Sequence, residues 1–132
     1  EKIISSNLLN IELKSPMSRN QLIDEYKSAD ILFLHLNNYK PFQKVLPSKI
    51  FEYAATGKPI LAGVTGYAAE FLRSEVKGVE IFNPCDIESM NNCLIKLLKG
   101  PREYDRTRFI KIYDRNKIVK MISKDILSLI KE

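Results

Sequence analysis

The sequence is poor in the residues that build metal centres and disulfide frameworks. It has two cysteines, Cys85 and Cys93, and a single histidine, His35. The cysteines lie eight positions apart, which is neither a zinc-ligand pattern nor a disulfide framework, so we expect reduced thiols in a cytosolic protein. His35 has no second histidine, cysteine or carboxylate at ligand spacing, and we expect neither a metal site nor a cofactor. We predict a packed or hydrogen-bonded histidine at the end of a strand, and a general base is the alternative.

Long apolar runs, internal repeats and low-complexity linkers are missing too. No apolar run approaches the roughly 20 residues that span a bilayer. The 132 residues are 45% hydrophobic, which predicts one domain that is large enough to bury its own core.

Charge is unevenly placed along the chain. Residues 1–98 hold equal numbers of basic and acidic residues, whereas residues 99–132 hold the whole net charge of +5. A solvated outer face explains such a segment, and contact with anionic lipid is the functional alternative. No aromatic and basic platform for stacking bases is visible, so we predict no nucleic-acid partner.

Strand and helix patterns alternate along the chain. The expected strands cover residues 11–13, 31–36, 60–62 and 79–82, and Ser18 caps the first expected helix. The expected helices cover residues 19–28, 48–56, 66–76, 87–98, 102–113 and 117–131. We expect buried stripes on two of them, formed by Leu22, Ile23 and Tyr26, and by Ile87, Met90, Leu94, Ile95 and Leu98. Strands separated by helices predict a parallel sheet, whose ligands bind outside the carboxyl ends of the strands.

The most informative stretch is a loop, a short helix, a tight turn and a buried strand. Pro47 or Ser48 opens the helix, Gly57 ends it in a left-handed conformation, and the next strand is apolar without alternation. At about 100° per residue, one helix face carries Ile50, Phe51, Ala54 and Ala55, and the other carries Lys49, Glu52, Tyr53 and Thr56.

Lys49 and Glu52 therefore occupy the polar side of the first turn of this helix. A helix start and Lys49 favour an anion, whereas Glu52 accepts hydrogen bonds and donates none. A diphosphate at the helix start and a ribose at Glu52 would describe a nucleotide. The alternative is a capped surface helix with a solvated Lys and Glu.

The order of these segments resembles the donor-binding half of retaining glycosyltransferases of family 4, which have the GT-B fold. The resemblance runs from about Ile11 to Leu98 and rests on Ser28-Ala29-Asp30-Ile31-Leu32-Phe33-Leu34, Pro47-Ser48-Lys49-Ile50-Phe51-Glu52-Tyr53, Gly57-Lys58-Pro59-Ile60 and Gly66-Tyr67-Ala68-Ala69-Glu70. The second of these segments is especially similar to bacterial enzymes that build lipopolysaccharide and other surface polysaccharides from UDP-sugars, often N-acetylated ones.

The resemblance implies the sites that bind the sugar donor. Glu52 corresponds to the ribose-binding Glu, and we expect further contacts from Leu46, Pro47, Ser48, Lys49, Gly66 and Glu70. The base would lie against the loop that contains Met17, and one of Tyr39, Tyr53 and Tyr67 would pack on the base or the sugar. The family has another Glu eight residues before the ribose Glu, where this chain has Lys44. That Lys either adds positive charge near the diphosphate or points to solvent. No catalytic residue is assigned.

The expected fold is a Rossmann-like parallel sheet flanked by helices, the C-terminal half of a GT-B enzyme. Residues 1–132 would form a partial donor-binding domain that is incomplete at its N-terminus, with residues 101–132 as a helical extension. Because similar enzymes have a preceding acceptor-binding domain, we expect the isolated chain to be inactive and to self-associate through its last helix.

The expected function is to bind a nucleotide sugar, a UDP-N-acetylhexosamine or a derivative, for retaining transfer to a glycolipid or surface polysaccharide. The resemblance implies a cytoplasmic enzyme, with contact at the inner face of the plasma membrane. The alternatives are an enzyme similar to UDP-sugar 2-epimerases and a non-catalytic nucleotide-binding or regulatory module. A receiver domain is disfavoured, because Asp30 begins its expected strand instead of ending it.

Overall fold

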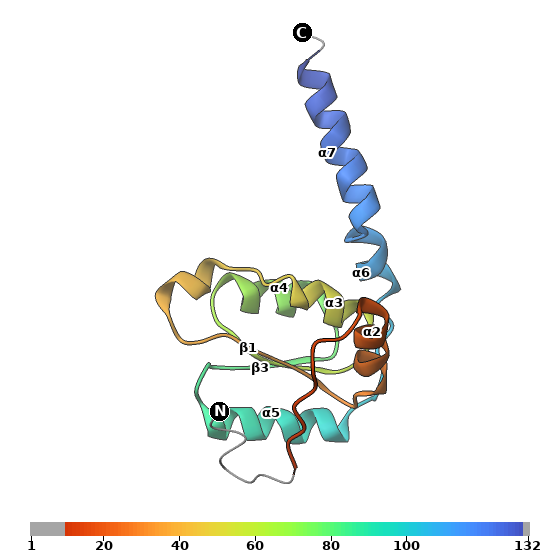
Figure 1. The fold of residues 1–132 in the computed structure, drawn as a ribbon. Coiled ribbons are helices and arrows are strands. Elements are labelled where there is room, and N and C mark those ends of the chain that lie inside the picture. Colours follow the sequence, from red (N-terminus) through yellow and green to blue (C-terminus); the bar gives the residue numbers. More distant parts are fainter. Residues whose placement is uncertain (1–9, 131–132) are drawn as a thin grey trace.

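Three short parallel strands form the centre of the computed structural model, which describes residues 10–130 (Figure 1). They are β1 (Leu32–His35), β2 (Ile60–Gly63) and β3 (Val79–Phe82), in the spatial order β1-β2-β3. Leu32 and Val79 both lie opposite Ile60 of the central strand. The prediction of a parallel sheet built from βαβ units is therefore confirmed.

Helices lie on both faces of this sheet (Figure 1). Helices α3 (Lys49–Ala55) and α4 (Tyr67–Glu75) cover one face, and α5 (Ile87–Lys99) covers the other. The remaining elements are α2 (Arg19–Ser28), a 3₁₀ helix η1 (Lys40–Lys44), α6 (Thr107–Ile112) and α7 (Arg115–Leu129).

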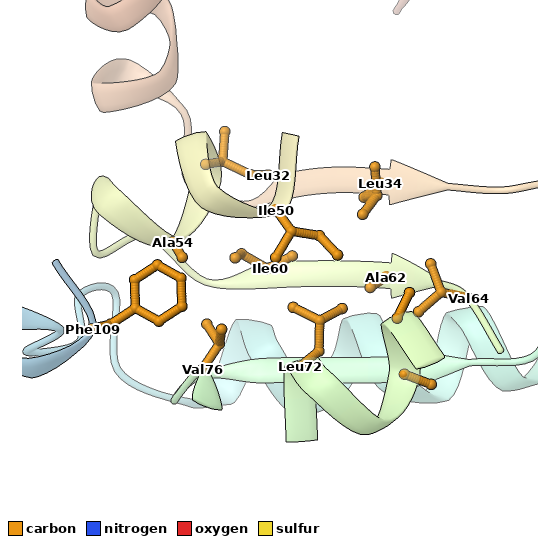
Figure 2. Packing of buried hydrophobic residues seen from close by; sticks show 12 residues of the cluster. Leu32, Leu34, Ile50, Ala54, Ile60, Ala62, Val64, Leu72, Val76 and Phe109 are labelled. Atoms are coloured by element: carbon orange, nitrogen blue, oxygen red, sulfur yellow. The ribbon is translucent and has the colours of Figure 1, made fainter. Parts of the chain in front are cut away.

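The main core fills the space between the sheet and α3, α4 and α6 (Figure 2). Its most deeply buried large side chains include Ile50 of α3, Ile60 of β2 and Leu72 of α4. Each such side chain stabilises the fold by about 1.5–3 kcal/mol. All four residues of β2 are buried, as its apolar run without alternation predicts for a central strand.

A smaller core lies under α5 and confirms only part of the predicted stripe of that helix. Met90 and Leu94 pack against this core, whereas Ile87, Ile95 and Leu98 are exposed. Cys93 and Leu97 are the buried residues of α5, whereas Ile87 is 70% and Leu98 66% exposed. The helix contacts β2 and β3. Only a narrow part of its apolar surface is buried, and sequence periodicity does not specify which part.

The predicted strand at residues 11–13 is wrong. Residues 11–18 form no regular element, and Ile11 and Leu13 are exposed. A strand of three residues needs a neighbouring strand for its hydrogen bonds, and β1 pairs only with β2 among the described residues. By contrast, α2 has the predicted bounds, and its Ser18 cap is confirmed as a reciprocal capping box with Gln21.

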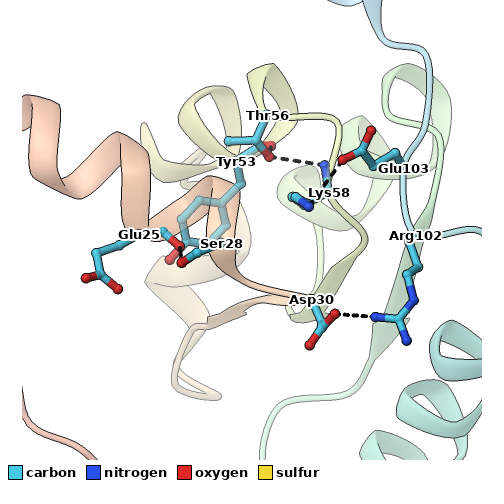
Figure 3. Close-up of polar contacts among 8 residues, drawn as sticks. All are labelled: Glu25, Ser28, Asp30, Tyr53, Thr56, Lys58, Arg102 and Glu103. Carbon is cyan, nitrogen blue, oxygen red and sulfur yellow. Dashed lines mark hydrogen bonds and ion pairs between the residues drawn. The ribbon is translucent and has the colours of Figure 1, made fainter.

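Helix α6 begins at Thr107, five residues later than predicted. The segment before it is attached to the body of the domain by side-chain contacts. Arg106 is 4% exposed and donates hydrogen bonds to the carbonyl oxygens of Tyr53, Ala54, Lys77 and Gly78. Burial lowers the pKa of Arg106 to about 10. Nearby, Arg102 pairs with Asp30, and Lys58 pairs with Glu103 at 3.3 Å (Figure 3).

Helix α7 projects away from this body (Figure 1). It begins after Asp114, whose side chain accepts a hydrogen bond from the Lys117 amide, and it contains no buried residue. Between residues 10 and 130, no helix is long and apolar enough to cross a bilayer.

Candidate functional site

The stretch from Leu46 to Gly63 adopts the predicted order of loop, helix, turn and strand. The helix starts at Lys49, directly after Ser48, which has helical backbone angles and whose side chain makes no capping hydrogen bond. The Ile50 and Phe51 amides instead donate to the carbonyl oxygens of Pro47 and Ser48, each at 3.1 Å. Gly57 has φ +78°, as a left-handed helix end requires.

The two faces of α3 are close to those predicted. Ile50 and Ala54 are buried, Phe51 is half-buried, and Lys49 and Glu52 lie on the outer side. Ala55 is exposed, so its predicted place on the buried face is wrong. At about 100° per residue, Ala55 lies about 140° around the helix from the buried Ile50, which places it outside the buried face.

Lys49 and Glu52 contact each other and a third residue, Tyr26 of α2. The Lys49 ammonium lies 2.9 Å from Glu52 Oε2 and donates a hydrogen bond of 2.6 Å to Tyr26 Oη. Tyr26 Oη lies 3.4 Å from the same carboxylate oxygen. The three residues are hereafter called the Tyr26 cluster.

The electrostatics of the Tyr26 cluster favour a charged Lys49. Its hydrogen bond to Tyr26 and then its hydrogen bond to Glu52 raise the pKa of Lys49, against a smaller opposing effect of burial. The ion pair is accessible, with side-chain exposures of 43% for Lys49 and 36% for Glu52. Among residues 10–130, no hydrogen bond reaches the second carboxylate oxygen, Glu52 Oε1, which can therefore accept from a ligand.

Sequence reasoning assigned Tyr26 to a buried stripe and missed its polar contacts. The side chain is indeed half-buried and packs against the main core. A half-buried tyrosine usually places its hydroxyl on a hydrogen-bond partner, which was the available signal. Its partners lie 23 and 26 residues away, however, so no local pattern identifies them.

The other predicted contact residues lie in separate places. Leu46 and Pro47 are half-buried in the segment that enters α3, and Ser48 and Lys44 are exposed. The remaining predicted residues are Met17, Lys44, Gly66 and Glu70. Within the described part of the chain, no hydrogen bond or ion pair joins any of them to the Tyr26 cluster.

Gly66 and Met17 nevertheless have clear structural surroundings. Gly66 has φ +61°, and a Cβ there would overlap the backbone of Gln43 in η1. Met17 lines an open pocket of about 480 Å³ with Lys14, Ser15, Pro16, Leu22 and Glu25. Glu70 is exposed in the first turn of α4.

His35 is packed and hydrogen-bonded, as predicted. Its Nε2 accepts a hydrogen bond of 3.3 Å from the Cys85 amide, and its ring packs beside those of Phe33 and Phe82, with centroids 6.2 and 6.1 Å away. Cys85 and Cys93 are free thiols. Residues 10–130 contain no group of three side chains that could hold a metal ion.

Asp30 and the three candidate tyrosines bear on the alternatives. Asp30 lies before β1 and pairs with Arg102, so it is not at the strand end where a receiver domain would need a phosphoacceptor. Tyr39 and Tyr67 are exposed, at 62% and 53%. Tyr53 instead packs edge-on against Tyr26, with ring centroids 5.1 Å apart.

Comparison with known proteins assigns the chain to a family. The family described as "Glycosyl transferases group 1" matches residues 1–113, a range that includes the sheet, α2 to α6 and the Tyr26 cluster. No curated protein and no solved structure matches the chain. With most of its length matched, the chain belongs to the group 1 glycosyltransferases, whose members act on a sugar donor.

Proposed function

We propose that this chain binds a UDP-sugar, a UDP-N-acetylhexosamine or a derivative, and that the enzyme transfers the sugar with retention to a glycolipid or surface polysaccharide. The observation that carries the proposal is the Tyr26 cluster, because it offers a carboxylate with one occupied and one available oxygen. A ribose has vicinal hydroxyls that donate to such an oxygen. Glu52 would thus bind the ribose, as the resemblance to family 4 enzymes implies.

In this proposal, Lys49 does not act solely as a cation that binds the diphosphate. Its ammonium already contacts Glu52 and Tyr26, so part of its charge is compensated within the Tyr26 cluster. It has three N–H donors, of which these two contacts occupy two. The third N–H donor of Lys49 and its remaining positive charge would bind the diphosphate. Lys44 would add positive charge where its loop lies near the diphosphate.

The remaining parts of the proposal concern the base and the acceptor. The pocket beside Met17 would receive the base, since its wall is largely apolar and it adjoins α2, which also carries Tyr26. A preceding domain of the same enzyme would bind the acceptor in the cytoplasm, at the inner face of the plasma membrane. Exposed basic residues of α6 and α7 would each add about 1 kcal/mol of attraction to an anionic surface, and they are Arg108, Lys111, Arg115, Lys117, Lys120 and Lys124.

Calorimetric titration with UDP tests the role of Glu52. We expect Glu52→Ala to lower UDP affinity about ten- to hundredfold, because it removes hydrogen bonds to a charged acceptor worth about 1.5–3 kcal/mol. Glu88→Ala is the matched control, since Glu88 is an exposed carboxylate in the first turn of α5. Both variants should remain folded, as neither side chain belongs to a core. Equal affinity of the wild type and Glu52→Ala would refute the proposal.

A further inference from the structure

Tyr26 links two segments that are distant in sequence at the atoms proposed to bind the ribose. Its hydroxyl accepts a hydrogen bond of 2.6 Å from the Lys49 ammonium. The same hydroxyl lies 3.4 Å from Glu52 Oε2, to which it donates. A phenol oxygen can do both at once, because it has one O–H donor and acceptor lone pairs.

The ring of Tyr26 is held in place independently of its hydroxyl. It packs edge-on against Tyr53, with an interplanar angle of 80°, and contacts the main core. The Lys49 ammonium lies 5.3 Å from the ring centroid, within the range of a cation–π contact. The ring and its contacts therefore fix where the hydroxyl lies.

The Lys49–Glu52 pair needs such a third contact to keep one geometry. An accessible ion pair three residues apart on a helix contributes little stability, too little to confine two long side chains. The hydroxyl supplies a second fixed partner for the ammonium and a second donor for Oε2. Both directed contacts are made to Oε2, which leaves Oε1 without a hydrogen bond among residues 10–130.

We propose that Tyr26 is a positioning residue, whose hydroxyl holds Lys49 and Glu52 Oε2 together and so presents Glu52 Oε1 to the ribose hydroxyls. This inference rests on the proposed function, since it names a residue that acts through Glu52. Tyr26 itself does not touch the nucleotide in this arrangement.

The test uses Tyr26→Phe, which removes the hydroxyl and keeps the ring. Titration of the 132-residue chain with UDP and with 2′,3′-dideoxy-UDP separates positioning from folding. We expect a three- to tenfold loss of UDP affinity and an unchanged affinity for the dideoxy nucleotide, which lacks the hydroxyls that Glu52 would bind. In a Glu52→Ala background, Tyr26→Phe should cause no further loss.

Tyr53→Phe is the matched control, because the Tyr53 hydroxyl makes no hydrogen bond among residues 10–130 and its ring belongs to the same aromatic pair. It should leave UDP affinity unchanged. Equal UDP affinity of the wild type and Tyr26→Phe would overturn the inference while leaving Glu52 in its role. An equal loss for both nucleotides, or a full loss in the Glu52→Ala background, would show a general structural effect and overturn it as well. If Glu52→Ala binds UDP as the wild type does, the proposed function and this inference fail together.

Discussion

At the scale of single residues, Arg106 shows how a buried cation is accommodated without a carboxylate. Its guanidinium lies among the carbonyl oxygens at the end of α3 and in the turn before β3. Five donors in a fixed plane match several carbonyl groups at once, which a lysine cannot do. Burial costs part of this gain, as the lowered pKa of Arg106 shows. Arg106 thus joins α3, which carries Lys49 and Glu52, to the turn before β3.

We therefore expect Arg106→Met to lower the free energy of unfolding by about 2–3 kcal/mol. The change removes the hydrogen bonds of a charged donor and leaves the buried carbonyl oxygen of Ala54 and the part-buried ones of Lys77 and Gly78 with fewer partners. Urea unfolding followed by circular dichroism measures the loss. Arg108→Met is the control, since Arg108 is exposed only two residues further along the chain. Equal midpoints for the two variants would mean that the contacts of Arg106 contribute no net stability.

At the scale of elements, sequence patterns predicted what is decided locally. The cap and bounds of α2 follow from Ser18 and Gln21, and the burial of β2 follows from its apolar run. The bounds of β3 were also correct. The buried face of α5 and the absence of a strand at residues 11–13 depend on which neighbours are present, so periodicity alone did not predict them. In the candidate site, Lys49 and Glu52 were predicted from their helix, whereas Tyr26 required the tertiary fold.

Gly66 lies where the start of α4 meets η1, and it gives a prediction at this scale. Its backbone angles, φ +61° and ψ −139°, lie in a region that favours glycine, and it lies against η1. Gly66→Ala should therefore lower the free energy of unfolding by about 1–3 kcal/mol, because the added methyl meets backbone atoms of Gln43 that cannot simply rotate away.

Gly100→Ala is the control for this change. Gly100 has φ −88°, and its added Cβ would lie 3.3 Å from the Tyr104 hydroxyl, which can shift. We expect a loss of less than about 0.5 kcal/mol for this variant, as for an ordinary surface substitution. Thermal unfolding of the two variants tests this difference in stability. Equal melting temperatures of Gly66→Ala and Gly100→Ala would contradict the prediction for Gly66.

At the scale of the whole molecule, α7 differs from everything else in the fold. It extends beyond the body in Figure 1, and it lies after residue 113, where the match to the family ends. One side of α7 carries exposed apolar side chains at helical spacing, and these include Ile118, Ile122, Ile126 and Leu129. A separate stripe carries Lys117, Lys120 and Lys124. An amphipathic helix gains most of its stability by burying its apolar side, which α7 does not do within residues 10–130.

Contact between copies of this chain through α7 would bury that apolar side and leave the lysines in water. We therefore expect the 132-residue chain to self-associate as its concentration rises, with a mass above that of the monomer in light scattering. Replacing Ile122 and Ile126 by Lys should restore the monomer, because two charges would then lie on the apolar side. The melting temperature of the body should stay the same, since α7 has no buried residue. Asn116→Lys with Ser128→Lys is the charge-matched control, as both positions lie outside the apolar side, and this variant should associate as the wild type does. A wild-type chain that remains strictly monomeric at high concentration would contradict the prediction.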